Sequence, residues 1–142
     1  MSEQEKSKID PQHYISHSVM IQPIELCEKL PFCVGNAVKY IIRAGSKDGE
    51  SERDDLLKAR WYLMRSMDNG DTITLDHVAT FIADRFAQAK PALGILFGTT
   101  PQCEEWPLRK RLYRVLDILS ERIRQIETDE FIASLRNKNL NN

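Results

Sequence analysis

The apolar positions of this chain follow a helical pattern almost throughout, with little of the alternation expected of strands. They repeat every three or four residues in three successive segments, residues 32–43, 51–68 and 75–88. Pro23 can occupy the first turn of a short helix, to about Lys29, because the N–H that proline lacks is not needed there. We therefore predict an all-α fold, a compact bundle of about five helices.

The fifth helix is predicted to be long and to begin after Pro107. Its apolar residues alternate steps of three and four, the spacing typical of a helical bundle or coiled-coil seam. They are Leu108, Leu112, Val115, Leu119, Ile123 and Ile126. This seam could pack inside the chain or between chains, and we expect a homo-oligomer.

Turn and capping residues separate these helices. Ser51 and Thr74 are placed to cap the third and fourth helices, and Asn69-Gly70 ends the third. Residues 90–107 contain three prolines and two glycines, which predicts mostly loop. The fourth helix is expected to bury Val78, Phe81, Ile82 and Phe86.

The length of 142 residues suits one compact unit. Residues 1–10 are polar and lack periodicity, and we interpret them as a flexible tail. Residues 11–70 form the expected helical domain, residues 71–135 a C-terminal helical extension packing on it, and residues 136–142 a second tail.

Charge and composition narrow the class of partners. The formal net charge of -1, from 20 basic and 21 acidic residues, gives no overall attraction to nucleic acid or membrane, so only a local basic patch could bind an anion. The three scattered cysteines do not form a disulfide framework, and no run of 18 apolar residues occurs. We expect a soluble, cytoplasmic protein.

One such patch is predicted on residues 32–43. Asn36, Lys39 and Arg43 fall within about 60° of one another, opposite the apolar stripe of the same helix. We call these three residues the basic face. Its simplest interpretation is a solvated surface. Residues of the next helix could instead indicate that it belongs to a binding site.

The third helix repeats this arrangement with Asp55, Lys58 and Tyr62, which also share a face. A short connection predicts that the two helices are antiparallel neighbours, which would bring these residues and Tyr40 near the basic face. Arg and Lys suit phosphate, and tyrosine rings suit a planar base. The alternative is that the charged residues only form surface ion pairs, worth under about 1 kcal/mol each.

An ordered series of motifs supports a ligand site. HY at 13–14, IQPIE at 21–25, FCVGNAVKYIIRAGSKDG at 32–49 and DDLLKARWYL at 54–63 resemble a small bacteriophage domain of the phage nucleotide kinase group. The usual pattern there is a histidine-tyrosine start, GNAIKY, an arginine with AGKKDG, and EDLKKAIWYL. The resemblance covers roughly residues 12–66 and departs from the pattern at Asp54, Leu57 and Arg60.

The resemblance implies a phage-type protein of the host cytoplasm that handles nucleotides, with phosphoryl transfer to deoxynucleoside monophosphates. The chain has no GxxxxGK[ST] segment, so helix side chains would bind the phosphates. Our hypothesis assigns catalysis to Asp55 and Lys58. It assigns nucleotide binding to Asn36, Lys39, Tyr40, Arg43 and Tyr62. A non-catalytic protein that sequesters a nucleotide or a nucleotide-derived host signal is the alternative.

A further hypothesis concerns magnesium. Glu25 and Glu28 form an ExxE pair and Glu52 and Asp55 an ExxD pair, similar to the Mg²⁺-binding pattern of all-α nucleoside triphosphate pyrophosphohydrolases. Because residues three apart share a helix face, two such pairs could hold cations that bridge phosphates. If the four carboxylates converge, a Mg²⁺-dependent nucleoside triphosphate pyrophosphohydrolase is a second alternative function, and Mg²⁺ is the expected cofactor.

Overall fold

A computed structural model describes residues 21–46 and 51–141 of the chain. Its helices are α2 (Pro23–Cys27), α3 (Phe32–Arg43), α4 (Glu52–Asn69), α5 (His77–Ala89), α6 (Pro91–Phe97) and α7 (Leu108–Leu140), with a 3₁₀ turn at Pro101–Cys103. These two ranges contain no strand, which confirms the all-α prediction. The tail predicted at residues 1–10 and the histidine-tyrosine motif lie outside the described residues.

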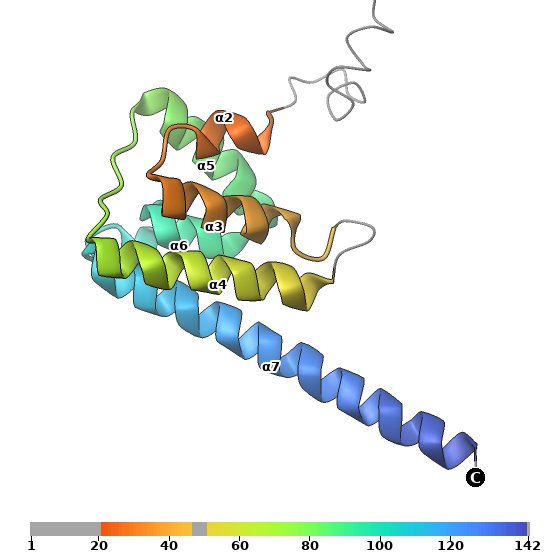
Figure 1. Cartoon of the computed structure of the whole chain (residues 1–142). Coiled ribbons are helices and arrows are strands. Elements are labelled where there is room, and N and C mark those ends of the chain that lie inside the picture. Colours follow the sequence, from red (N-terminus) through yellow and green to blue (C-terminus); the bar gives the residue numbers. More distant parts are fainter. Residues whose placement is uncertain (1–20, 47–50, 142) are drawn as a thin grey trace, which may run out of the picture.

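Helices α3 and α4 lie side by side and run antiparallel, as the short connection predicted (Figure 1). Helix α7 follows the other side of α4 and then continues well beyond the rest of the molecule (Figure 1). Helix α2 packs on α3, and α6 packs on both α5 and α7. Helix α4 is therefore covered by neighbours on two sides.

The predicted apolar stripes form the core. The apolar stripe of α3, Val34, Ala37, Val38 and Ile41, is buried, and Leu56, Ala59 and Leu63 of α4 pack in the same cluster. Met64, which helical spacing also predicted at the edge of the α4 stripe, is exposed. The α7 seam is also buried, at Leu112, Val115, Leu119 and Ile123. Because this seam packs against α4 and α6 of its own chain, it is not the surface on which a second copy could dock.

Capping explains where α4 and α5 begin and end. The Ser51 hydroxyl accepts a hydrogen bond from the Asp54 N–H at 3.0 Å, and Gly70 ends α4 in the left-handed conformation, both as predicted. Helix α5 begins later than predicted. Asp76 rather than Thr74 caps it, by accepting from the Ala79 N–H at 2.7 Å. Both residue types are good caps, and a carboxylate also interacts favourably with the helix dipole.

Three further expectations for the C-terminal half were wrong. Residues 91–97 form helix α6 rather than loop, because Pro91 occupies its first turn and Gly98 its left-handed end. Helix α7 continues through residues 136–140, which were predicted as a tail. In α5, Val78 and Phe81 are exposed, because α5 turns the small side chains of Ala79 and Ala83 inward.

Helices α2 and α3 are held in close contact at Gly35. A Cβ atom at this position would lie 2.8 Å from the carbonyl oxygen of Cys27, closer than real Cβ contacts allow. The absence of a side chain therefore lets the start of α3 pack directly on the end of α2.

No helix in residues 21–46 and 51–141 has both the length and the hydropathy needed to cross a lipid bilayer.

Candidate functional site

The α3–α4 face is organised around two tyrosines, one from each helix. The rings of Tyr40 and Tyr62 lie 6.0 Å apart, centroid to centroid, and are tilted by only 13°, so they stack with an offset. The antiparallel packing of the two helices produces this pairing, since it places Tyr40, late in α3, beside the middle of α4, where Tyr62 lies. The prediction that α3 and α4 bring these side chains together is confirmed.

Three cations surround the Tyr40 ring. Lys39 Nζ lies 4.5 Å, Arg43 Cζ 4.9 Å and Lys58 Nζ 5.4 Å from its centroid, all within the range of cation–π contacts. We call Lys39, Arg43 and Lys58 the basic cluster. Two of its members come from α3 and one from α4, so only the packed helix pair assembles it. This concentration of positive charge would attract an anion.

Asp55 lies behind the basic cluster rather than on the surface. Its side chain is fully buried, and its Oδ1 accepts hydrogen bonds from Arg43 Nη2 at 2.7 Å and from Arg43 Nε at 3.1 Å. The other carboxylate oxygen, Oδ2, is buried without a hydrogen-bond partner. Asp55 therefore fixes the guanidinium of Arg43, and the role predicted for it, of organising a metal at the ligand, does not fit this position.

Burial of Asp55 follows from the packing of α4. The helical spacing places Asp55 beside the core stripe of α4, only about 40° from Ala59. Because α3 packs on α4 and its Arg43 side chain pairs with Asp55, this edge of the helix is enclosed. The helical spacing was therefore a signal for this burial, and it was missed because Asp55 was grouped with Lys58 and Tyr62.

Two exposed aromatic residues extend the tyrosine pair. Phe32 is 76% and Trp61 60% exposed, and both meet the Tyr62 ring edge to face, at centroid distances of 6.3 Å and 5.1 Å. Sequence reasoning missed both. A signal was present for Phe32, because helical spacing places it on the basic face, four residues before Asn36. Together these rings give the face apolar, planar surface next to positive charge.

Asn36 is engaged by its own helix. Its Nδ2 donates to the carbonyl oxygen of Phe32 at 2.9 Å, a contact within one turn. Arg60, which departs from the usual family pattern, points to the opposite side of α4. Its Nη1 donates to Ser120 Oγ of α7 at 3.3 Å, so Arg60 stabilises the α4–α7 contact and lies away from the basic cluster.

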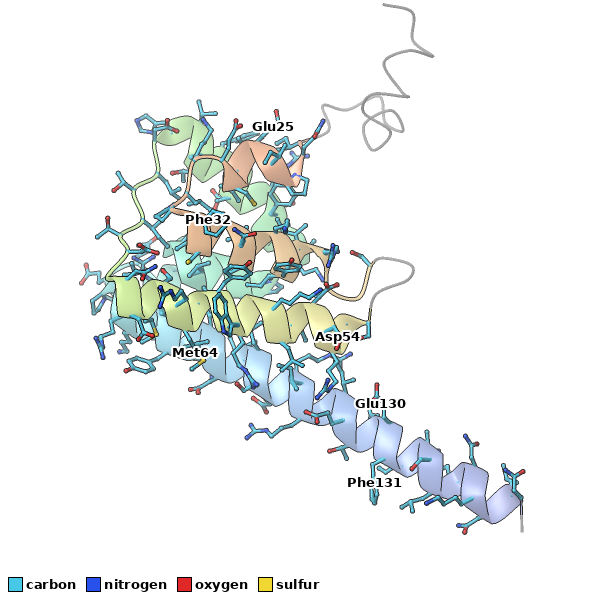
Figure 2. All side chains as sticks on the ribbon, in the orientation of Figure 1. Glu25, Phe32, Asp54, Met64, Glu130 and Phe131 are labelled. Carbon is cyan, nitrogen blue, oxygen red and sulfur yellow. The ribbon has the colours of Figure 1, made fainter. Side chains whose placement is uncertain are left out.

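The four carboxylates predicted to hold magnesium do not converge. Glu25 caps its own helix, where its Oε2 accepts from the Gln22 N–H at 2.6 Å, and Glu28 is exposed at the end of α2. Glu52 pairs with Arg122 of α7 through two hydrogen bonds of 2.8 and 3.0 Å. Figure 2 shows Glu25 and Asp54, next to Asp55, in separate parts of the molecule.

Among the residues that the structure describes, no group of three or more His, Cys, Asp or Glu side chains could hold a metal ion. The prediction that Glu25, Glu28, Glu52 and Asp55 form one metal site was therefore wrong. The physical reason is that three of these carboxylates have other partners. Glu25 caps its own helix, Glu52 pairs with Arg122, and Asp55 pairs with Arg43.

Residues 8–64 match a protein family described as "Protein of unknown function (DUF3310)". The match ends inside α4 and covers less than half of the chain, and it includes the whole of the basic cluster. No curated protein and no solved structure matches the chain.

Proposed function

We propose that the α3–α4 face binds nucleotides and acts on them as a kinase-like phosphotransferase. The observation that carries this proposal is the basic cluster around the stacked tyrosines, with exposed aromatic rings beside it. A nucleotide combines a multiply charged phosphate with a planar base, so a face that combines cations with open ring surfaces suits both parts. The resemblance of residues 12–66 to the phage nucleotide kinase group supports the same ligand class.

In this proposal Lys39 and Lys58 contact the phosphate, and the positive charge of Arg43, which the buried Asp55 orients, attracts the same group. Charge-assisted contacts of this kind contribute about 1.5 to 3 kcal/mol each. The base lies against Tyr62 and the exposed rings of Phe32 and Trp61. Magnesium would enter with the phosphates of the nucleotide, since Mg²⁺ commonly bridges phosphates with few protein ligands.

The alternative is that the same face sequesters a nucleotide or a nucleotide-derived signal without changing it. The position of Asp55 favours this alternative, because its one hydrogen-bonded oxygen is already committed to Arg43. An arginine held in place before the ligand arrives costs less entropy on binding, which benefits a binding protein as much as an enzyme. Either protein would act in the cytoplasm of a phage host.

A turnover experiment distinguishes a kinase-like enzyme from a protein that only sequesters the nucleotide. The chain is incubated with ATP, Mg²⁺ and each nucleoside monophosphate in turn, and the nucleotides are separated by chromatography. A new diphosphate supports the kinase, and an unchanged nucleotide that co-elutes with the protein supports sequestration. Neither turnover nor co-elution, with any nucleotide, would contradict nucleotide binding altogether.

A matched control for this experiment lies on α7. Lys110 Nζ sits 4.3 Å from the Trp106 ring centroid, the same type of contact as Lys39 makes with Tyr40. Lys110→Ala should behave as the parent chain, whereas Lys39→Ala should lose turnover or co-elution. An equal loss in both variants would show that general surface charge, rather than the basic cluster, binds the nucleotide.

A further inference from the structure

The last turns of α7 present apolar side chains that pack against nothing in the described part of the chain. The buried seam of this helix ends at Ile123, with Ile126 half-buried, and every described residue after Ile126 is exposed. Phe131, at 63%, is among the most exposed large apolar residues of the molecule. Figure 1 shows this part of α7 projecting away from the other helices.

These side chains form a stripe of their own. At 100° per residue, five residues fall within an arc of about 100°, nearly opposite the buried seam. They are Thr128, Phe131, Ile132, Leu135 and Asn139. We call them the distal stripe. In Figure 2, Phe131 and Glu130 project on opposite sides of α7, which agrees with this placement. The distal stripe is therefore not a continuation of the seam, and α4 could not cover it.

The charged residues beside the distal stripe are complementary to those of a second copy of the helix in the antiparallel orientation. One flank carries Glu127 and Lys138, and the other carries Asp129 and Arg136, each flank with its acid nearer the N-terminal end. In an antiparallel helix pair, the same flank of each helix faces the same flank of its partner. Each acid would then face a base, whereas a parallel pair would place like charges at equal heights.

Both charge pairs require the same register between the two antiparallel helices. If Glu127 faces Lys138 of a second copy and Asp129 faces Arg136, the two-fold axis passes between Ile132 and Ala133 in each pairing. The same register brings Phe131 alongside Leu135 of the second copy. Apolar contacts and charges thus agree on one arrangement, which two identical chains can satisfy simultaneously.

We propose that a second copy of this chain docks antiparallel on the distal stripe and forms a two-fold dimer through the last turns of α7. Each copy contributes one short helix face, so the interface lies at the small end of protein–protein interfaces and the dimer is reversible. The flanking charges make it sensitive to salt. Glu127 lies 3.6 Å from Arg53 of its own chain, an exposed contact that it would exchange for Lys138 of the second copy.

Sedimentation velocity over a range of concentrations tests this proposal. The parent chain should change from a 16.4 kDa monomer to a dimer as concentration rises. Phe131→Glu should raise the dimer dissociation constant by about tenfold or more, because it places a charge in the apolar contact. Val78→Glu is the matched control, since Val78 is 60% exposed but lies on α5. A monomer at every concentration, or a Phe131→Glu variant that dimerises as the parent does, would overturn the proposal.

Two charge-reversed variants distinguish a loss of dimerisation from a loss of folding. One variant carries Arg136→Glu and Lys138→Glu, and the other carries Glu127→Lys and Asp129→Lys. Each alone should be monomeric with the helix content of the parent by circular dichroism, and the mixture should form a heterodimer. Failure of the mixture to associate would contradict the proposed pairing.

Cross-linking tests the orientation. Ile132→Cys should form a disulfide-linked dimer on oxidation, because Ile132 lies near the two-fold axis. Glu127→Cys should not, since residue 127 would lie about 16 Å along the helix axis from residue 127 of the second copy, beyond disulfide reach. The parent chain, with its own three cysteines, is the control. Cross-linking of both variants alike would indicate a parallel pair and overturn the antiparallel arrangement.

Discussion

At the residue scale, the site depends on the Arg43–Asp55 pair. Asp55 is fully buried, and Arg43 reaches from it towards the surface with its side chain 27% exposed. A buried carboxylate is stabilised by its cationic partner, and each partner becomes costly if the other is removed. The pair therefore contributes to stability and to the geometry of the basic cluster at once.

Asp55→Asn keeps the shape of the side chain but removes its charge, so the charge-assisted hydrogen bonds from the half-buried Arg43 guanidinium are weakened. We expect the free energy of unfolding to fall by about 1 to 3 kcal/mol, measured by urea denaturation. Asp54→Asn, one residue earlier and exposed, is the control and should stay within about 0.5 kcal/mol of the parent. Equal stability of all three chains would show that the Arg43 contact is not structural.

Sequence alone predicted part of this residue-scale picture. The shared face of Lys39 and Arg43 follows from helical spacing, and so does the proximity of Tyr40 to Tyr62 once α3 and α4 are taken as antiparallel neighbours. Helical spacing places Asp55 only about 40° from Ala59, but its complete burial depends on how closely α3 packs on α4 and on the Arg43 side chain that covers it. The contact of Asn36 with the Phe32 carbonyl likewise depends on side-chain conformation.

At the element scale, the approach of α2 to α3 sets the position of the basic face. Gly35→Ala should favour the helix by up to about 1 kcal/mol on intrinsic propensity. Its Cβ would nevertheless lie 2.8 Å from the Cys27 carbonyl oxygen, and the required shift of α2 should cost about 1 to 3 kcal/mol. We therefore expect a lower melting temperature. A rise would show that the two helices separate easily.

A second contact between elements ties the start of α4 to α7. The hydrogen bonds from Arg122 hold the pKa of the Glu52 carboxyl below its ordinary value. A lowered pKa in the folded state means that this contribution to stability is complete above about pH 4.3, the unfolded value, and is lost as pH falls through the folded pKa.

Glu52→Gln should therefore lower the stability at neutral pH slightly, because the pair is partly exposed, and it should reduce the difference in stability between neutral and acidic pH by the same small amount. Thermal melts at pH 7 and pH 3 measure this difference. Glu28→Gln, which removes an exposed carboxylate at the end of α2, provides the control for loss of a single charge. Identical pH profiles for Glu52→Gln and the parent would contradict the interpretation.

The helices were predicted correctly where apolar residues repeat within one segment. The prediction failed at prolines and glycines, which occur both in loops and at the ends of helices. The stripes of α3 and α4 and the seam of α7 repeat within single segments, and the structure buries most of their residues as expected, with Met64 of α4 exposed. The prolines and glycines in residues 90–107 predict a loop. Pro91 and Gly98 instead delimit α6, and only the apolar residues that α6 buries between α5 and α7 decide the outcome.

At the scale of the whole molecule, the chain combines a helical body with a projecting helix. The described residues after Ile126 are all exposed, so they contribute little to the packed core. A chain that ends at residue 128 should unfold at the same temperature as the parent, with a stability change within about 0.5 kcal/mol. Thermal melts at low concentration, where the parent is monomeric, test this. A large loss of stability would show that the distal part of α7 packs against its own chain.

The central claim is that the basic cluster and the tyrosine pair bind a nucleotide. Lys39 tests it most directly, because its side chain is exposed and lies outside the buried Arg43–Asp55 pair. Replacing it should leave the fold intact while removing a charge-assisted contact with the phosphate.

The measurement is isothermal titration calorimetry of the parent, Lys39→Ala and Lys110→Ala with each of the four deoxynucleoside monophosphates. We predict that at least one nucleotide binds the parent and Lys110→Ala equally. It should bind Lys39→Ala about tenfold to a hundredfold more weakly, at an unchanged melting temperature. Binding of equal strength to all three chains, or to none of them, would contradict the account.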